Sequence, residues 1–345
     1  MQTYRQLFFL KFASMCYLCY LRVVFLVNID VKMEIVRYNS SLKGEWDAFV
    51  RSAKNSTFLF MRDYMDYHAD RFMDVSLMFY DNKVLRALLP ANYCCDDKAV
   101  VSHGGLTYGG FIFSADVKGN EALVFFDEAL RWMKAELDAV RFIYKPVPYI
   151  YSLLPAQEDL YALFRVGARL VGRSLSSVVD NSCRQMFSEL RRRKVVKAAK
   201  NGVEYACSDD FSSYWNILTA VLVQRHSCHP VHSLDEILLL RSRFPENIKL
   251  YAAYNSGAML AGCVVYETEN VAHIQYIASS DAGREIGALD GLFDYLFNNV
   301  YRDIKFIDFG ISTENGGRVL NEGLLFQKEG FGARGVVYDV YEIDL

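Results

Sequence analysis

The sequence predicts an α+β protein built from two successive copies of one fold. Helical and strand-like periodicities follow one another in the same order in residues 33–180 and in residues 208–345. Each copy closes with a helix and then a strand, and the two junctions share a pattern: Leu163-Phe164 before Gly167-Ala168-Arg169, and Leu325-Phe326 before Gly332-Ala333-Arg334. The chain of 345 residues is 52% hydrophobic, which is enough to fill two cores of ordinary size.

The first 32 residues form an apolar N-terminal extension. Lys11 and Arg22 limit the longest stretch without a charge to residues 12–21, which is shorter than the roughly 20 apolar residues of a spanning helix, so no stable membrane span is expected. Met33 begins a stretch typical of a soluble domain. We therefore predict that residues 1–32 result from a mis-assigned start, with an anchoring helix as the alternative.

In the first copy, residues 33–180, the periodicities predict four helices and five strands. One face of the longest helix carries Leu123, Phe126, Leu130 and Met133 at helical spacing. The predicted helices cover residues 43–51, 63–71, 120–137 and 157–164, and the strands cover 75–80, 84–91, 100–113, 140–145 and 170–179.

A basic connecting helix is expected in residues 181–207, before the second copy. Ser233, with Glu236 three residues later, predicts a capping box at the start of a helix. In the second copy, the expected helices cover residues 211–225, 233–243, 288–299 and 318–328, and the strands cover 248–254, 259–268, 271–278, 306–312 and 336–343. Residues 279–287 are expected to form a loop, and Gly330 is expected to let the chain turn into its last strand.

This order of elements resembles the GNAT superfamily of acyl-CoA transferases over residues 208–345. The Arg284-x-x-Gly287-Ala288 turn and the late Lys328-Glu329-Gly330-Phe331 segment carry the resemblance. Two such copies, joined by the basic stretch RRRKVVKAAKNGVEY, resemble the FemABX-type transferases and the BioF2-like acetyltransferases. The resemblance implies two tandem GNAT-like domains, each a mixed, mostly antiparallel sheet flanked by helices.

The resemblance also implies a donor and a function. Acetyl-CoA or another acyl-CoA would place its pyrophosphate at the helix N-terminus that follows Arg284, Gly287 and Ala288, in the second copy. Leu289 departs from the family pattern, which has Gly or Ala there. The implied reaction moves an acyl group to a small-molecule amine, on a sugar, an amino acid or a cell-envelope precursor. The alternatives are an aminoacyl-tRNA-dependent FemABX-type aminoacyltransferase and a non-catalytic ligand-binding protein.

Polar residues on two neighbouring strands are the candidates for catalysis (His273 and Asp308) and for substrate binding (Gln275 and Ser312). His273 and Gln275 share one face of their strand, and Asp308 and Ser312 share one face of the next. The resemblance implies that these strands splay apart around the acyl group, so His273 is expected to be the base and Asp308 its orienting partner. His232, just before the Ser233 cap, is expected to face the cleft between the two copies and to contact the substrate, and it is also a second candidate base. The alternative is that His273 and Asp308 are both structural: a histidine whose ring nitrogens are hydrogen-bonded within the protein, and a carboxylate at the end of a strand.

Two glycine-rich segments are expected to border the same substrate cleft. The segment from Ser102 to Gly110 contains His103 and Tyr108, and the loop from Thr313 contains Glu314 and Arg318, which are expected to hold a polar substrate. An irregular strand is the alternative for the first segment.

Charge and cysteine usage exclude several classes of protein. A net charge of -3 gives no general attraction to nucleic acid, so tRNA is expected only under the aminoacyl-tRNA alternative. The eight cysteines are scattered, as in a cytoplasmic protein with reduced thiols. Pro230 interrupts the segment RHSCHPVHS, which has no acidic ligand nearby, so we expect no metal site. No pattern in the sequence indicates an oligomeric state.

Overall fold

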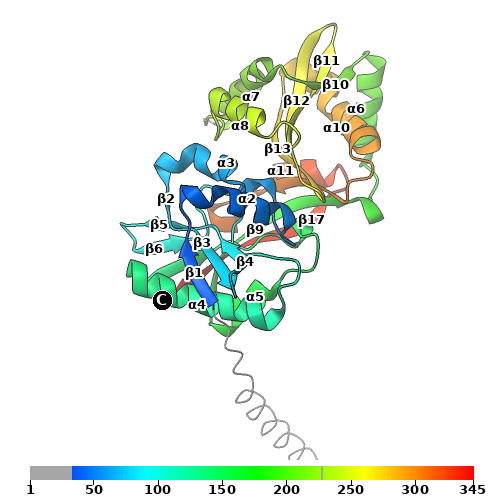
Figure 1. The fold of residues 1–345 in the computed structure, drawn as a ribbon. Helices are drawn as coiled ribbons and strands as arrows, with labels where there is room; N and C mark the ends of the chain where they lie inside the picture. The colour runs from blue at the N-terminus through cyan, green and yellow to red at the C-terminus, as the bar shows by residue number, and fades with distance from the viewer. Residues whose placement is uncertain (1–32, 227) are drawn as a thin grey trace, which may run out of the picture.

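The structure, a computed structural model, describes residues 33–226 and 228–345 (Figure 1). The predicted N-terminal extension, residues 1–32, lies outside these residues. Within them, no helix combines the length and the apolar character that a membrane crossing requires. The two halves of the chain, residues 33–180 and 208–345, form two lobes in Figure 1, and strands β9 and β17 lie where the lobes meet.

The predicted elements of the first half occur in the predicted order, and the structure adds short strands in residues 33–37, 73–74 and 92–94 that were not predicted. The helices are α2 (Lys43–Ser52), α3 (Arg62–Met65), α4 (Gly119–Leu137) and α5 (Glu158–Arg165), with 3₁₀ turns η1 (Ser40–Leu42), η2 (Phe58–Phe60), η3 (Asp66–Arg71) and η4 (Tyr149–Tyr151). The strands are β1 (Met33–Arg37), β2 (Met73–Asp74), β3 (Leu77–Asp81), β4 (Val84–Leu89), β5 (Asn92–Cys94), β6 (Ala99–Val101), β7 (Ile112–Phe113), β8 (Arg141–Tyr144) and β9 (Arg169–Asp180).

The second half begins after a 3₁₀ turn, η5 (Asn181–Cys183), and the predicted basic helix. Its helices are α6 (Glu189–Lys200), α7 (Phe211–His226), α8 (Leu234–Arg243), α9 (Asp281–Ile286), α10 (Ala288–Tyr295) and α11 (Glu322–Glu329), with a π-helical turn η6 (Leu296–Val300) and a 3₁₀ turn η7 (Asn315–Gly317). Its strands are β10 (Glu204–Ser208), β11 (Ile248–Asn255), β12 (Ala258–Glu267), β13 (Val271–Ser279), β14 (Phe306–Ile311), β15 (Thr313–Glu314), β16 (Val319–Leu320) and β17 (Arg334–Asp344). The capping box of Ser233 and Glu236 is present at α8 and confirms that helix start.

Two predictions in the first half are wrong in detail. Residues 100–113 do not form one strand, because the chain folds back on itself between β6 and β7: a Cβ on Gly109 would lie 1.9 Å from the carbonyl oxygen of Ser102. Residues 63–71 do not form one helix, because α3 ends at Met65 and His68 has a non-helical backbone (φ -128°, ψ 30°).

Three predictions in the second half also need correction. The expected loop of residues 279–287 contains α9, because the Ser280 hydroxyl accepts the Gly283 N–H and caps a short helix. The expected helix 318–328 starts only at Glu322, after β16, where the Asn321 side chain provides the cap. The turn into the last strand is made by Gly332 (φ +89°), not by Gly330, whose φ of -60° is still helical.

The closing strands of the two halves are exchanged. Within the described residues, one eleven-stranded sheet runs through both halves in the order β10-β11-β12-β13-β14-β9-β17-β8-β6-β5-β2. The last strand of the first half, β9, therefore pairs with β14, and the last strand of the second half, β17, pairs with β8. β9 and β17 also pair with each other. The division into residues 33–180, 181–207 and 208–345 stays a prediction, because the sheet is continuous across it.

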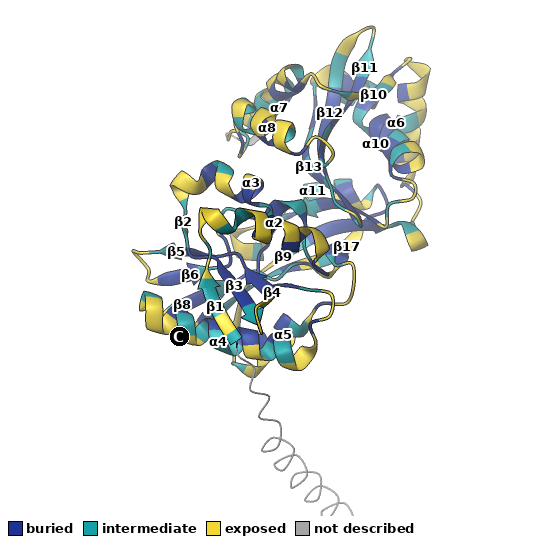
Figure 2. Cartoon of the chain, in the orientation of Figure 1, coloured by how far each residue is buried: buried dark blue, intermediate teal, exposed yellow. Residues whose placement is uncertain are grey.

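The apolar cores lie against this sheet. One core packs α4 on the strands of the first half, and another packs α6 and α10 on the strands of the second half. A third joins the halves through contacts such as Phe58 with Phe244, whose ring centroids are 5.3 Å apart. Figure 2 shows the exposed residues concentrated on the outer helices, as expected for helices that bury one face.

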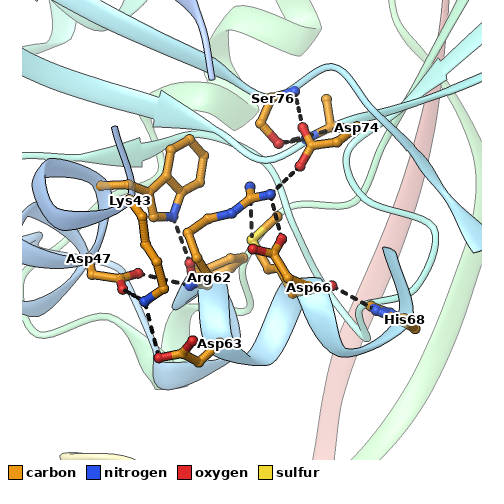
Figure 3. Close-up of polar contacts among 12 residues, drawn as sticks. Lys43, Asp47, Arg62, Asp63, Asp66, His68, Asp74 and Ser76 are labelled. Carbon is orange, nitrogen blue, oxygen red and sulfur yellow. Dashed lines mark hydrogen bonds and ion pairs between the residues drawn. The ribbon is translucent and has the colours of Figure 1, made fainter. Parts of the chain in front are cut away.

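A buried arginine holds the start of α3 in place (Figure 3). The Arg62 guanidinium pairs with Asp66 at 2.6 Å and with Asp74, and it stacks over the Tyr38 ring at 3.7 Å. Asp47 accepts the backbone N–H of Arg62 at 2.8 Å. Because every charge here has an opposite partner, the arginine can be buried, and it fixes the segment that carries Tyr64 and Tyr67 towards the second half.

Candidate active site

His273 and Asp308 form a hydrogen-bonded pair where two parallel strands separate. They face each other in the register of β13 and β14, and the pairing of these strands ends with them. The Nδ1 atom of His273 lies 2.8 Å from Oδ2 of Asp308. The two residues are therefore adjacent, as predicted, and the strands part beyond them, as the resemblance implied.

Asp308 is fully buried and saturated with hydrogen bonds. Besides His273, its Oδ2 accepts the hydroxyls of Tyr151 at 2.9 Å and Tyr338 at 2.6 Å. Its Oδ1 accepts the Ser176 hydroxyl at 2.6 Å and the Gly310 N–H at 2.9 Å. The last bond is possible because a bulge in β14, with Gly310 at φ +72°, turns that N–H inwards.

The charge of Asp308 fixes the tautomer of His273. Burial by itself raises the pKa of the Asp308 carboxyl, but the proximity and hydrogen bond of His273, with those of Ser176 and Tyr338, hold it below its ordinary value. An ionised carboxylate can only accept a hydrogen bond, so Nδ1 of His273 carries the hydrogen and donates it, and the other imidazole nitrogen, Nε2, carries the lone pair. Among the described residues no partner for His273 Nε2 is found, which leaves that atom free for a substrate.

His273 stands between two cavities. The first has a volume of about 300 Å³ and lies towards the first half, with walls from α3, η3 and the Gly104 segment. The second has a volume of about 670 Å³, is more open, and follows β13 from His273 to Ile277 opposite Gly310. Thr107, Tyr108 and Gln275 line both cavities, as His273 does. A reaction at His273 can thus receive one reactant from each side.

Two lysines, Lys145 and Lys328, line the second cavity, together with Asp339, whose carboxylate is paired with Arg173. Burial lowers the pKa of Lys145 to about 8, and burial also lowers that of Lys328 to about 8 against the opposing pull of Asp308. Lys328 donates to the carbonyl oxygens of Gly310 at 2.8 Å and Ile311 at 2.7 Å. An ammonium group has three N–H donors, so one remains for a group in the cavity.

His232, the second candidate base, lines only the first cavity. Its Nδ1 lies 2.5 Å from the Tyr276 hydroxyl, and burial lowers its pKa to about 4. The imidazole is therefore neutral at pH 7. His232 stacks near Tyr67 with ring centroids 5.8 Å apart, so it belongs to a contact between the two halves. Whether it binds substrate stays a prediction.

The remaining predicted substrate residues divide into two groups. Gln275 and Tyr108 line the cavities, although the Tyr108 hydroxyl is turned to Thr57 at 3.3 Å. The residues that line the two cavities do not include four others that we predicted. His103 and Ser312 are buried elsewhere, and Glu314 and Arg318 are exposed next to Asn321 and Asn315.

The predicted coenzyme turn is occupied by contacts within the chain. Arg284 lies in α9, where its guanidinium bonds to the Ser279 carbonyl oxygen at 2.5 Å and to Asp281. Gly287 has φ +80°, and a Cβ there would lie 2.6 Å from the carbonyl oxygen of Lys194 in α6. Ala288, the first residue of α10, is fully buried. The lack of a side chain at Gly287 therefore allows the backbone of α6 to pack closely against this turn.

A substitution at Gly287 is expected to destabilise the protein. Gly287→Ala should lower the free energy of unfolding by about 2–3 kcal/mol, because it adds left-handed backbone strain and a clash with α6. Gly257, with φ +79° and no atom within 4 Å of a Cβ, is the matched control. Gly257→Ala should cost only about 1 kcal/mol. Urea unfolding measures both, and equal losses would contradict the contact between Gly287 and α6.

The histidine- and cysteine-rich segment contributes to the second cavity. The side chain of His226 lies outside the described residues, and Cys228 and His229 line the second cavity. Among the residues that the structure describes, no group of three or more His, Cys, Asp or Glu side chains is arranged to hold a metal ion.

Sequence reasoning missed four residues of the candidate site. Tyr338 and Ser176 lie on the exchanged strands, Tyr151 lies in η4, and Lys328 lies in α11. Ser176 carried a weak signal, because a serine pair interrupts an otherwise apolar strand end. Tyr338 carried none, since its alternation with Val336 and Val340 matches a core-facing strand equally well.

Comparisons with known proteins agree with the tandem fold. A scan of protein-family models finds no match, and a search of curated proteins also finds none. Among solved structures, the chain is similar to FemX, with 13% identity, coverage of 90% of this chain and 97% of FemX, and a TM-score of 0.65.

Two lysylphosphatidylglycerol synthetase structures are also similar. The L-PGS of Bacillus licheniformis has 12% identity, coverage of 88% of this chain and 92% of that one, and a TM-score of 0.56. The C-terminal domain of a putative lysylphosphatidylglycerol synthetase from Agrobacterium fabrum has 12% identity, the same two coverages and a TM-score of 0.55. These likenesses confirm the predicted fold of two tandem GNAT-like domains.

Proposed function

We propose that this chain is an acyltransferase in which His273 accepts a proton from an amine acceptor. The observation that carries the proposal is the pair of His273 and Asp308, placed where β13 and β14 separate and open to a cavity on either side. An aminolysis reaction needs an activated acyl group, a neutral amine, a base within reach and a donor for the developing oxyanion.

The chain supplies the base and an oxyanion donor for such a reaction. As the amine nitrogen bonds to the acyl carbon, Nε2 of His273 takes the amine proton, and Asp308 stabilises the imidazolium. The third N–H of Lys328 is available to the acyl oxygen. When the bond from carbon to the leaving sulfur or oxygen breaks, the imidazolium returns its proton to the leaving group, so protons and electrons balance.

The donor we propose first is acetyl-CoA or another acyl-CoA. The second cavity supports this choice, because it is open and has Lys145 and Lys328 on its walls, which suits a long anionic donor. The proposed acceptor is a small amine, and the proposed location is the cytoplasm.

An aminoacyl-tRNA donor is the second candidate, and α6 favours it. The side chains of Arg192, Arg193, Lys197 and Lys200 line one exposed surface of this helix. A row of cations on a helix can follow a phosphate backbone. The fold shared with FemX is compatible with either donor.

An assay of donor consumption tests the proposal. The full chain is incubated with radiolabelled acetyl-CoA or with aminoacyl-tRNA and a panel of primary amines, and acyl-amine products are separated. We expect product from one donor, dependent on His273. If the folded chain consumes neither donor, it is instead a ligand-binding protein. If only the tRNA donor is consumed and α6 charge reversal abolishes that reaction, the second candidate replaces the first.

A further inference from the structure

The first cavity is lined by aromatic rings and by no charged residue. Its walls include Phe58, Tyr64, Tyr67, Tyr108, Tyr151 and Tyr266. None of its lining residues is an aspartate, glutamate, lysine or arginine. The second cavity differs, because its walls include Lys145 and Lys328. The two sides of His273 therefore offer different chemical environments to the two reactants.

His232 and four tyrosines of the first cavity are neutral at pH 7. His232 is uncharged because burial lowers its pKa to about 4. Burial raises the pKa of Tyr64, Tyr67, Tyr108 and Tyr266, so their hydroxyls stay protonated. A carboxylate or phosphate that entered would lose its hydration without meeting a lysine or arginine side chain, which is strongly unfavourable. Flat or cyclic apolar groups would instead pack against the rings.

Both halves of the chain close this cavity. Arg71 in the first half forms an ion pair with Glu236 in α8, and Tyr67 lies beside His232. Phe58 contacts Tyr266 with ring centroids 5.6 Å apart. Tyr151 connects the aromatic wall to the reacting pair, because its ring lies 4.6 Å from that of Tyr108 and its hydroxyl donates to Asp308. A ring held in the cavity would thus carry its substituent to His273.

We infer that the first cavity binds the acceptor, a small primary amine attached to an aromatic or cyclic apolar group without a carboxylate or phosphate. The inference rests on the proposed function and narrows its acceptor class. A volume of about 300 Å³ is at the small end of ligand pockets, which suits a single ring with a short aminoalkyl arm. The amine would lie at Nε2 of His273, and the donor would enter through the second cavity.

Direct binding without a donor tests this inference. The probes are 2-phenylethylamine and phenylalanine, which share a ring and an amine but differ by a carboxylate. Calorimetry with the full chain should show 2-phenylethylamine binding about tenfold or more tightly than phenylalanine. Equal affinities, or tighter binding of phenylalanine, would overturn the inference.

Variants locate the probe in one cavity or the other. Tyr67→Ala should weaken 2-phenylethylamine binding by about tenfold, whereas Tyr67→Phe, which keeps the ring and guards against a folding defect, should change it less than about threefold. Leu324→Ala, in the wall of the second cavity only, is the matched control and should leave the affinity unchanged. Loss of binding in Leu324→Ala but not in Tyr67→Ala would place the probe in the second cavity and overturn the inference.

The outcomes separate the two proposals. If 2-phenylethylamine binds as expected but no donor is consumed, the acyltransferase proposal fails and the cavity assignment stands. If amines are acylated but Tyr67→Ala changes the selectivity for the acyl group instead of the amine, the first cavity holds the acyl chain and the assignment fails.

Discussion

Replacing His273 by alanine is expected to reduce kcat for acyl transfer by about 10²–10⁴-fold, with a change of less than about threefold in donor affinity. The expected loss is large because His273 lines both cavities and Asp308 orients its imidazole. Nε2 of that imidazole, for which no partner is found among the described residues, is the atom that would take the proton. Single-turnover kinetics with saturating donor measure the chemical step, and calorimetry measures donor affinity.

His273→Asn is the control for structural damage. An asparagine amide can still donate a hydrogen bond towards Asp308 but cannot act as a base. We expect this variant to unfold at nearly the same urea concentration as the unmodified chain and to be as slow as His273→Ala. If His273→Asn kept full activity, His273 would have a structural role and His232 would become the candidate base.

Replacing Asp308 by alanine is expected to destabilise the protein by about 3–5 kcal/mol. The change leaves the hydroxyls of Ser176, Tyr151 and Tyr338 and the N–H of Gly310 without their acceptor in a fully buried site. Asp339→Ala is the matched control, because it also removes a carboxylate, here from a salt bridge between β17 and the half-exposed Arg173 on the neighbouring strand β9. It should cost less than about 1 kcal/mol. Urea unfolding of both variants tests the difference.

The acid dependence of stability provides a second test of Asp308. The folded pKa of this carboxyl lies below its ordinary value, so its contribution is fully present above the unfolded pKa of about 3.9. The contribution is lost as the pH falls through the folded pKa. In Asp308→Asn, the free energy of unfolding should therefore depend less steeply on pH below about pH 4. An unchanged slope would mean that Asp308 is not held ionised by its neighbours.

The sequence alone predicted most of the elements in their order and, through the family resemblance, the type of fold that they build. Local signals were strong where a single helix or strand repeats its own periodicity, as in α4 and α10, or carries its own cap, as Ser233 does for α8. The sequence also predicted that His273 and Asp308 lie next to each other. This depends only on two strands being adjacent and on which face each side chain occupies.

Predictions of local structure failed where a local signal was weaker than a tertiary contact. Residues 100–113 were predicted as one strand, but Gly109 lets the chain fold back on itself, and Gly104 and Gly105 line the first cavity. The coenzyme site at Gly287 stays a prediction, and the backbone of α6 lies against that glycine. Such contacts join segments far apart in sequence, and a short pattern carries no information about them.

The exchange of the closing strands was decided only by the tertiary structure, and it builds the candidate site. A strand's sequence specifies which residues point to each face, but an alternating strand can pair equally well with either of two similar sheets. Because β9 and β17 cross between the halves, Ser176 and Tyr338 both reach Asp308, which keeps that carboxylate charged while it is buried. The sequence thus determined the residues that can do the chemistry, and the pairing of distant strands determined which of them meet.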